Sequence, residues 1–188
     1  SNDNTTYSVG KDFLLAPLLV SVEPVQADNN ATTSSYLFNK QWLVNLQGLL
    51  KQINCNSWIY KEGKQRNVFV LETLCKNLDF NFNPSKLESA SEKAFYVKGF
   101  FDAEGGIPHN KDRFYIQLVQ KSFGKIKMIK SLLSDLGIES GKVHNPSKEV
   151  DPDYWRIFVS TKHHKRFADI VNSYHPMKSK IFCERMKI

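Results

Sequence analysis

The apolar positions in the second half of the chain switch between helical and strand spacing in a fixed order. Residues 95–104 form an apolar run closed by two glycines, a common way for a helix to end. Residues 113–120 alternate between apolar and polar side chains, which predicts a half-buried strand. Apolar side chains at helical spacing over 126–136, followed by Gly137, predict a second helix. The predicted unit is completed by strands near 142–144 and 154–159 and by a helix over about 164–173.

The first half of the chain repeats this order. The matching elements are an apolar run at 13–22, a strand at 35–40, a helix with apolar positions between 42 and 53, and a hairpin of 57–60 and 67–71 about a turn at 61–64. Corresponding elements lie roughly eighty residues apart, which indicates an internal duplication. We therefore predict an α+β fold of two α-β-β-α-β-β-α units with two antiparallel sheets, over residues 8–86 and 87–188.

The composition is that of a globular protein with a basic surface. Hydrophobic residues make up 41% of the 188 residues, enough to bury a core, and this argues against a disordered chain. The formal net charge is +7 and the isoelectric point is near 9.2, which favours a polyanionic partner. A protein-interaction module with incidental basic charge is the alternative that charge alone leaves open.

The cysteines and the apolar stretches bear on the compartment. The three cysteines are far apart and contain no CxxC pair, so we predict reduced thiols rather than a zinc site or a disulfide framework. No apolar stretch reaches the ~18–20 residues that cross a bilayer. The run at 13–22 lacks the basic leader of a signal peptide. We expect a protein of the cytoplasm, nucleoid or organellar matrix that is neither secreted nor bound to a membrane.

The segment FYVKGFFDAEGGI, residues 95–107, resembles the LAGLIDADG motif of homing endonucleases and intron maturases, and Val97 to Gly105 match position by position. The resemblance covers nearly the whole chain and is stronger in the second half. It implies the homing-endonuclease fold, a pseudo-twofold saddle built by a monomer in which two motif helices meet at the centre. It also implies that two antiparallel sheets beside these helices lie in the major groove of double-stranded DNA.

The resemblance assigns the acid at the end of each motif helix to a divalent metal ion, Mg²⁺ or Mn²⁺. Glu104 holds this position in the second unit, where the glycines after it permit close approach. The first unit departs from the motif, with Pro17 inside its apolar run. One register places Glu23 at the metal and is the one we favour; the other places Val22 there and removes the acid.

Two further pairs of positions carry over from the family. Gln120 matches a polar residue at a strand end that orders water near the metals, with Asn39 as its counterpart in the first unit. Lys178 matches a basic residue beside the scissile phosphates, with Lys86 as its counterpart. The run His-His-Lys-Arg at 163–166 is interpreted instead as solvated surface, because adjacent histidines on a helix point apart.

Side chains on one face of the predicted sheets are candidates for DNA contacts. We expect Phe114, Ile116 and Leu118 to pack on the helices, which turns the alternate side chains outward. Arginine and glutamine can bond to guanine and adenine edges in the major groove, and other basic side chains can hold phosphates. The DNA-binding candidates are Arg113, Tyr115, Gln117, Lys142, His144, Arg156, Tyr36, Tyr60, Lys61, Lys64 and Arg66.

These expectations describe a site-specific, divalent-metal-dependent endonuclease that makes a double-strand cut in a long DNA target. The alternative is a protein of the same fold that binds without cutting, either an intron-splicing maturase whose partner is RNA or a transcription regulator. The degenerate first motif motivates this alternative, because a double-strand cut requires an acid for each strand.

Overall fold

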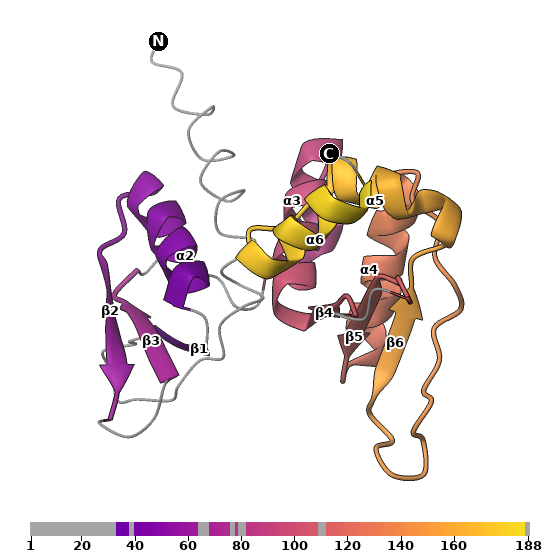
Figure 1. Cartoon of the computed structure of the whole chain (residues 1–188), viewed down its shortest axis with the longest axis horizontal. Coiled ribbons are helices and arrows are strands. Elements are labelled where there is room, and N and C mark those ends of the chain that lie inside the picture. The colour runs from indigo at the N-terminus through magenta and orange to yellow at the C-terminus, as the bar shows by residue number, and fades with distance from the viewer. Residues whose placement is uncertain are drawn as a thin grey trace.

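The chain folds as two neighbouring units, each a three-stranded antiparallel sheet with its own helices (Figure 1). The computed structural model describes the backbone of residues 33–37 and residues 40–63, 68–75, 78, 82–108 and 112–186. Within this described part of the chain, no helix is long and apolar enough to span a lipid bilayer. The predicted α+β class with two antiparallel sheets is confirmed.

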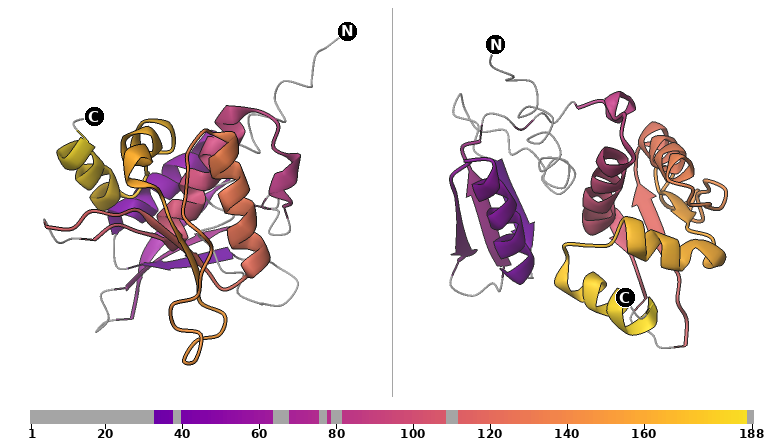
Figure 2. Two further views of the ribbon diagram at one scale, coloured as in Figure 1. Left: turned by 90° about the vertical axis from the view of Figure 1, so that its right-hand side faces the viewer. Right: turned by 90° about the horizontal axis from the view of Figure 1, so that it is seen from above.

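In the first unit, helix α2 (Lys40–Gln52) packs on one face of a sheet ordered β1-β3-β2 (Figure 2, right). The strands are β1 (Thr33–Leu37), β2 (Ser57–Glu62) and β3 (Val68–Thr73), so the predicted hairpin is confirmed. Buried side chains recur along α2 every three or four residues, which gives the helix one apolar face. They are Trp42, Leu43, Leu46, Leu49 and Leu50, and they share a core with Leu71.

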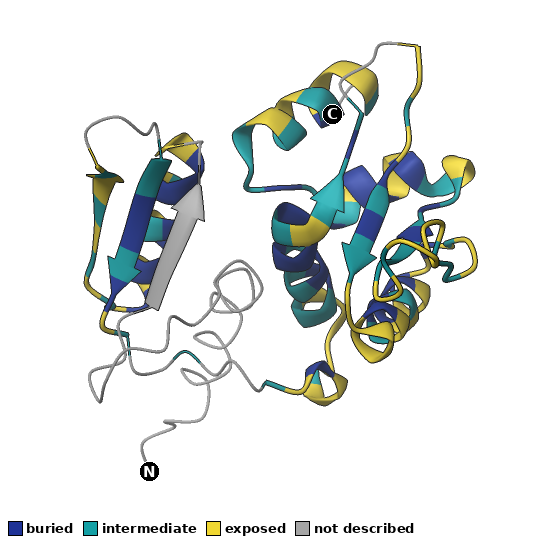
Figure 3. Cartoon of the chain, turned by 90° about the horizontal axis from the view of Figure 1, so that it is seen from below, coloured by how far each residue is buried: buried dark blue, intermediate teal, exposed yellow. Residues whose placement is uncertain are grey.

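The second unit contains the larger core. Its elements are α3 (Ala90–Glu104), β4 (Gly105–Gly106), β5 (Gln117–Gln120), α4 (Phe123–Asp135), β6 (Trp155–Phe158), α5 (His164–Ile170) and α6 (Pro176–Met186), with short 3-10 turns η1 (Pro84–Lys86) and η2 (Thr161–His163) before α3 and α5. The sheet is ordered β4-β5-β6. Buried positions concentrate on α3, α4 and α5, whereas residues 146–150 form an exposed loop (Figure 3).

The predicted duplication is visible where a strand leads into a helix in each unit. A 13-residue helix follows the strand in both, and a residue in the left-handed conformation follows both helices. The next amide bonds back to a carbonyl five positions earlier, at 2.9 Å from Cys55 to Leu50 and at 2.8 Å from Ile138 to Leu133. Along this strand–helix step, equivalent positions differ by 83 in residue number: Leu37 and Gln120, Lys40 and Phe123, Gln52 and Asp135, Asn54 and Gly137.

The strands of the second unit are shorter than the sequence predicts. β5 begins at Gln117 rather than at 113, because its partner β4 has only two residues. The segment 142–144 is not a strand, and it meets β6 through an isolated bridge between His144 and Arg156; a second bridge joins Ser140, just before the segment, to Val159, just after β6. These bridges hold the segment beside β6 in the position that β2 has beside β3.

Two of the cysteines form a disulfide, so the prediction of three reduced thiols is wrong. Cys55 follows α2 and Cys75 follows β3, and their Cα atoms lie 5.2 Å apart. Cys183 is free and exposed on α6. The disulfide bridges a sequence separation of 20 and fastens the β2–β3 hairpin to the end of α2.

The interpretation of residues 163–166 as solvated surface is wrong for His164, whereas Lys165 and Arg166 are exposed. His164 is buried, and its Nε2 lies 3.1 Å from the carbonyl oxygen of Val159. Arg166 donates to the carbonyl oxygen of Leu136 from Nε at 3.1 Å and from Nη2 at 2.9 Å. These bonds satisfy a carbonyl at the C-terminal end of α4. The run therefore ties α5 to the sheet and to α4.

Candidate functional site

Helix α3 begins where the sequence supplies a capping box. Ser89 Oγ accepts the amide of Glu92 at 3.1 Å, and the Glu92 carboxylate accepts the amide of Ser89 at 2.8 Å. The hydrogen bond from the Ser89 amide is the largest cause of the lowered pKa of Glu92. This capped start fixes the register of the 15 residues of α3, so that Glu104 is the last of them.

Aromatic side chains hold the end of α3 in the core of the second unit. The ring of Phe101 is fully buried, with its centroid 5.0 Å from Phe167 and 5.7 Å from Phe182. The chain passes from α3 directly into β4, and a Cβ on Gly105 would lie 2.8 Å from Phe101 Cε2. Gly105 is therefore required by this close approach of the strand to the ring. Glu104 is exposed at the junction.

Asp102, two residues before the end of α3, is a buried carboxylate with its partners on the segment before α6. Its Oδ1 accepts a short hydrogen bond from Ser173 Oγ, and its Oδ2 accepts the amide of Tyr174 at 2.9 Å. Burial raises the pKa of Asp102, and the hydrogen bonds and the charge of Lys178 oppose that rise. The carboxylate thus fixes the start of α6 against α3.

Lys178 makes a second connection between the two helices, in which a side chain of α6 donates to the backbone at the end of α3. Its Nζ donates to the carbonyl oxygens of Phe101 at 2.6 Å, Asp102 at 2.9 Å and Gly105 at 2.8 Å. Burial lowers the pKa of Lys178 to about 8, and the charges of Asp102 and Glu104 partly offset this effect. We refer to Asp102, Ser173, Tyr174 and Lys178 together as the α3–α6 clamp.

The same segment joins the two units. Asn45 of α2 donates from Nδ2 to the carbonyl oxygen of Tyr174 at 2.8 Å. The rings of Trp42 and His175 lie 5.3 Å apart, and Tyr174 packs on the core of the first unit. The end of α3 is therefore held in a defined position relative to the first unit.

The structure gathers some of the predicted catalytic residues and not others. Glu104 is the last residue of α3, and Lys178 of the clamp donates to the carbonyl oxygen of the next residue, Gly105. Gln120 lies on β5, two residues beyond Leu118, which pairs with Gly105, and on the side of the sheet that faces α3. Lys86 is exposed before the start of α3, so the length of that helix, roughly 20 Å, separates it from Glu104 (Figure 1). Glu23 and Asn39 lie outside the described residues.

Sequence reasoning missed Asp102 and Ser173 as parts of this site. Asp102 stood in the motif, but nothing in its local pattern marked a partner 71 residues further along the chain. The offset of 83 along the strand–helix step pairs Gln120 with Leu37, whereas the predicted counterpart of Gln120 is Asn39, which lies outside the described residues. The distance along the sequence between α2 and α4, whose apolar positions repeat after 83 residues, is the signal that could have revealed this offset.

The face of the second sheet that lies away from the helices gathers predicted DNA-binding residues around Phe158. Tyr115 meets the Phe158 ring edge-on at 5.5 Å, and the Arg156 guanidinium lies 5.0 Å over it. His144 stacks on the same ring at 5.7 Å and accepts a hydrogen bond from Arg156 Nε at 3.1 Å. Gln117 pairs with Phe158 across the sheet. A cation is thus held within an aromatic cluster on the outer face.

The expected inward and outward alternation along this segment is confirmed. Ile116 and Leu118 are fully buried, and Phe114 packs on the core. Arg113 is exposed, as is Lys142 on the segment beside β6. The outer surface of the second sheet therefore carries several of the predicted basic side chains.

The outer face of the first sheet carries a different charge. Trp58 and Tyr60 are each 41% exposed and donate to the two carboxylate oxygens of Glu72, at 2.9 Å and 2.5 Å. Lys61 is exposed but alternates with Tyr60, so it lies on the side of the sheet that faces α2. Outside the described side chains lie Tyr36 of β1, Lys64 and Arg66.

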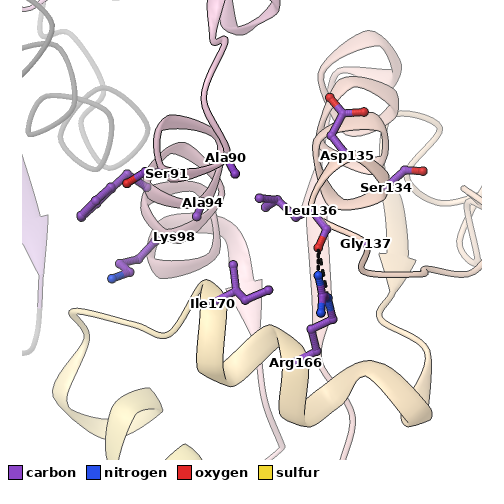
Figure 4. A pocket seen from close by; sticks show the side chains of 11 residues that line it. Ala90, Ser91, Ala94, Lys98, Ser134, Asp135, Leu136, Gly137, Arg166 and Ile170 are labelled. Atoms are coloured by element: carbon purple, nitrogen blue, oxygen red, sulfur yellow. Dashed lines mark hydrogen bonds between the residues drawn. The ribbon is translucent and has the colours of Figure 1, made fainter.

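A cavity of about 590 Å³ lies between the first half of α3, the end of α4 and α5 (Figure 4). Ala90 and Ala94 of α3, with Leu136 and Ile170, supply its apolar lining. Arg166 lines it while bonded to the Leu136 carbonyl oxygen. The cavity adjoins the opposite end of α3 from Glu104 and is separate from the candidate site.

Comparisons with known proteins agree with this architecture. Residues 91–172 match the family described as a LAGLIDADG-like domain. The homing endonuclease I-ApeI of Aeropyrum pernix is 30% identical over 86 residues, which are 45% of this chain and 37% of that protein. The match thus spans little more than a third of the relative.

Solved structures share the fold over most of the chain. I-DmoI in complex with DNA and Mn superposes with a TM-score of 0.63 at 16% identity, over 87% of this chain and 96% of I-DmoI. Full-length DUF199/WhiA from Thermatoga maritima gives a TM-score of 0.66 at 13% identity, over 94% of this chain and 60% of that one. The fold is that of the LAGLIDADG homing endonucleases. Residues 91–172 thus match a LAGLIDADG-like domain, and the motif lies in α3.

Proposed function

We propose that the protein is a site-specific DNA endonuclease whose cleavage centre includes Glu104. The observation that carries this proposal is an exposed carboxylate at the end of the motif helix, held against both units by the α3–α6 clamp. The relative I-ApeI is a homing endonuclease, and I-DmoI of the same fold binds DNA and Mn in its crystal structure. The net charge of +7 suits a DNA partner.

A divalent cation, Mg²⁺ or Mn²⁺, fits the donor set at Glu104. No cluster of three or more His, Cys, Asp or Glu side chains that could hold a metal occurs among the described residues. Mg²⁺ is commonly bound by one or two carboxylates together with substrate phosphates and water, so a single exposed acid is compatible with a site completed by DNA. When bound, the cation would activate water and stabilise the leaving oxygen.

The residues of this chain then have distinct tasks. Glu104 holds the cation, and Gln120 orients water beside it from the end of β5. The outer faces of the two sheets bind the major groove, where the Arg156 cluster supplies donors for guanine or phosphate. Both units are present in one chain, so we propose that a monomer spans the whole target.

The test begins with selection of a tight target from a randomised duplex library, followed by cleavage in Mg²⁺. Glu104→Gln should lower the cleavage rate about 100-fold or more while target affinity stays the same. Glu88→Gln is the matched control, because Glu88 is also exposed but lies before the opposite end of α3. Cleavage by Glu104→Gln at the parent rate would refute the assignment.

A second candidate function is binding without a double-strand cut. The feature that favours it is the offset of 83 between β1–α2 and β5–α4, which pairs Ser21, not an acid, with Glu104 when it is carried back along the sequence. This candidate predicts a selected duplex that is retained and either nicked in one strand or left intact in Mg²⁺ and Mn²⁺. Tighter binding of intron RNA than of any duplex would favour a maturase.

A further inference from the structure

We propose that Lys178 is a positioning residue, which holds the helix end that carries Glu104 and does not itself bond to the scissile phosphate. This inference rests on the proposed function and departs from the expectation that Lys178 sits beside that phosphate. It follows from the contacts of the ammonium group, from the needs of the helix terminus and from the way α6 is anchored.

The ammonium group of Lys178 has no donor left for a phosphate. A lysine ammonium carries three N–H donors. In this structure Nζ donates to three backbone carbonyl oxygens, those of Phe101, Asp102 and Gly105, all within 2.9 Å. The side chain is half-buried, and Nζ lies 4.7 Å from the centroid of the Phe101 ring. A bond to phosphate would require one of these carbonyls to lose its partner.

The end of α3 needs a cation from elsewhere in the fold. The last carbonyls of a helix lack partners inside the helix, and the helix dipole places negative charge there. The last turn of α3 contains no basic residue, and its final residue is the acid Glu104. Lys178 supplies the missing donors from α6, at the junction of α3 with β4. The same contacts set the direction in which the chain leaves the helix.

The clamp contains two connections, one from Asp102 of α3 to the segment before α6 and one from Lys178 of α6 to the backbone of α3. The position of Lys178 is therefore fixed by the anchoring of α6 and not by its side chain alone. The Asp102 carboxylate accepts Ser173 Oγ and the Tyr174 amide, which fixes the segment just before α6. Lys178 then returns from the first turns of α6 to the backbone of α3. Loss of either connection should loosen the end of α3 and let Glu104 sample other orientations.

The first measurement uses the free protein without metal or DNA. Amide hydrogen exchange of Gly105 and Gly106 should speed up about tenfold or more in Lys178→Met, because the helix end and β4 are released. Lys180→Met is the matched control, since Lys180 is exposed on the same helix and pairs with Glu184 at 3.8 Å. Parent-like protection in Lys178→Met would overturn the proposal.

The second measurement is single-turnover cleavage of a selected duplex at increasing Mg²⁺ concentration. A positioning role predicts that Lys178→Met raises the half-saturating Mg²⁺ concentration about 10- to 100-fold, with the rate recovering at saturation and DNA affinity unchanged. A reduced rate at every Mg²⁺ concentration with the same half-saturation would show that Lys178 acts on the phosphate, and would overturn the proposal. If the parent cleaves no duplex, the proposed function fails, and hydrogen exchange still decides the role of Lys178.

Ser173→Ala provides a second variant if Lys178→Met does not fold. It removes one hydrogen bond to Asp102 and leaves every bond of the ammonium group in place. A positioning role predicts a smaller change in the same direction for both hydrogen exchange and Mg²⁺ dependence. Parent values in both measurements would contradict the clamp.

Discussion

Adding one methyl group at either of two glycines should change stability in opposite directions. At Gly105 a Cβ would lie 2.8 Å from Phe101 Cε2 and closer still to Phe101 Cδ2 and the Phe101 carbonyl oxygen. The backbone oxygen cannot move without breaking the end of α3, and the ring is fixed between Phe167 and Phe182. At Gly48, in the middle of α2, no heavy atom lies within 4 Å of the added Cβ.

The two effects can be estimated separately. Overpacking a well-filled core typically costs about 1–3 kcal/mol, and contacts this short place Gly105→Ala near the upper end, at about 3 kcal/mol. Glycine inside an exposed helix is less favourable than alanine by about 0.5–1 kcal/mol, so Gly48→Ala should stabilise the protein by that amount. The difference between the variants, about 4 kcal/mol, is a large part of the stability of a typical domain.

Urea unfolding followed by circular dichroism measures both free energies. We expect the midpoint to fall for Gly105→Ala and to rise for Gly48→Ala. Gly105→Ala should also cleave poorly, because the chain would leave α3 in a different direction beside Glu104. A stability for Gly105→Ala within about 0.5 kcal/mol of the parent would refute the close packing of β4 on Phe101.

Two further changes test other parts of the fold. Reduction with dithiothreitol should destabilise the protein by roughly 3 kcal/mol, because the Cys55–Cys75 disulfide closes a segment with a sequence separation of 20. The control Cys183→Ser should leave the stability unchanged. An unfolding midpoint that is insensitive to reductant would exclude the disulfide. Burial lowers the pKa of His164 below 6.5, so the unfolded chain binds the proton first as the pH falls. The contribution of His164 to stability should therefore be fully present above about pH 6.5 and decrease as the pH falls towards 5. Urea unfolding at both pH values measures this loss, and it should be smaller in His164→Gln.

The sequence predicts the repeated elements well because their signals are local. The apolar spacing of α4 and the glycine after it are contiguous, and Gly137 has the positive φ of 67° that a helix stop of this kind requires. The capping box of Ser89 and Glu92 is also local, and it starts α3 at Ala90, five residues before the apolar run at 95–104. These features need no information from distant parts of the chain.

The features that the sequence does not predict depend on distant partners. β5 is short because β4 has two residues, and no pattern in residues 113–120 reveals the length of the partner. His164 stands in a charged run, yet it is buried by the fold around Val159. Cys55 and Cys75 are brought together because α2 and β3 end at the same side of the unit. The hydrogen bond between Asp102 and Ser173 in the clamp likewise joins residues far apart in the sequence.

The two units have the same backbone arrangement, but the outer faces of their sheets carry different side chains, and this difference affects the symmetry of the DNA target. The strand–helix step repeats with a constant offset, whereas the outer face of one sheet presents the carboxylate of Glu72 and that of the other presents Arg156. A carboxylate can accept from the amino group of cytosine, while arginine suits guanine or phosphate. A palindromic duplex would offer the same base edges to both faces and could satisfy only one of them. We therefore expect library selection to return a target with unlike halves, and Glu72→Gln to relax the base preference in one half alone. A palindromic consensus, or a change in both halves, would contradict this division between the sheets.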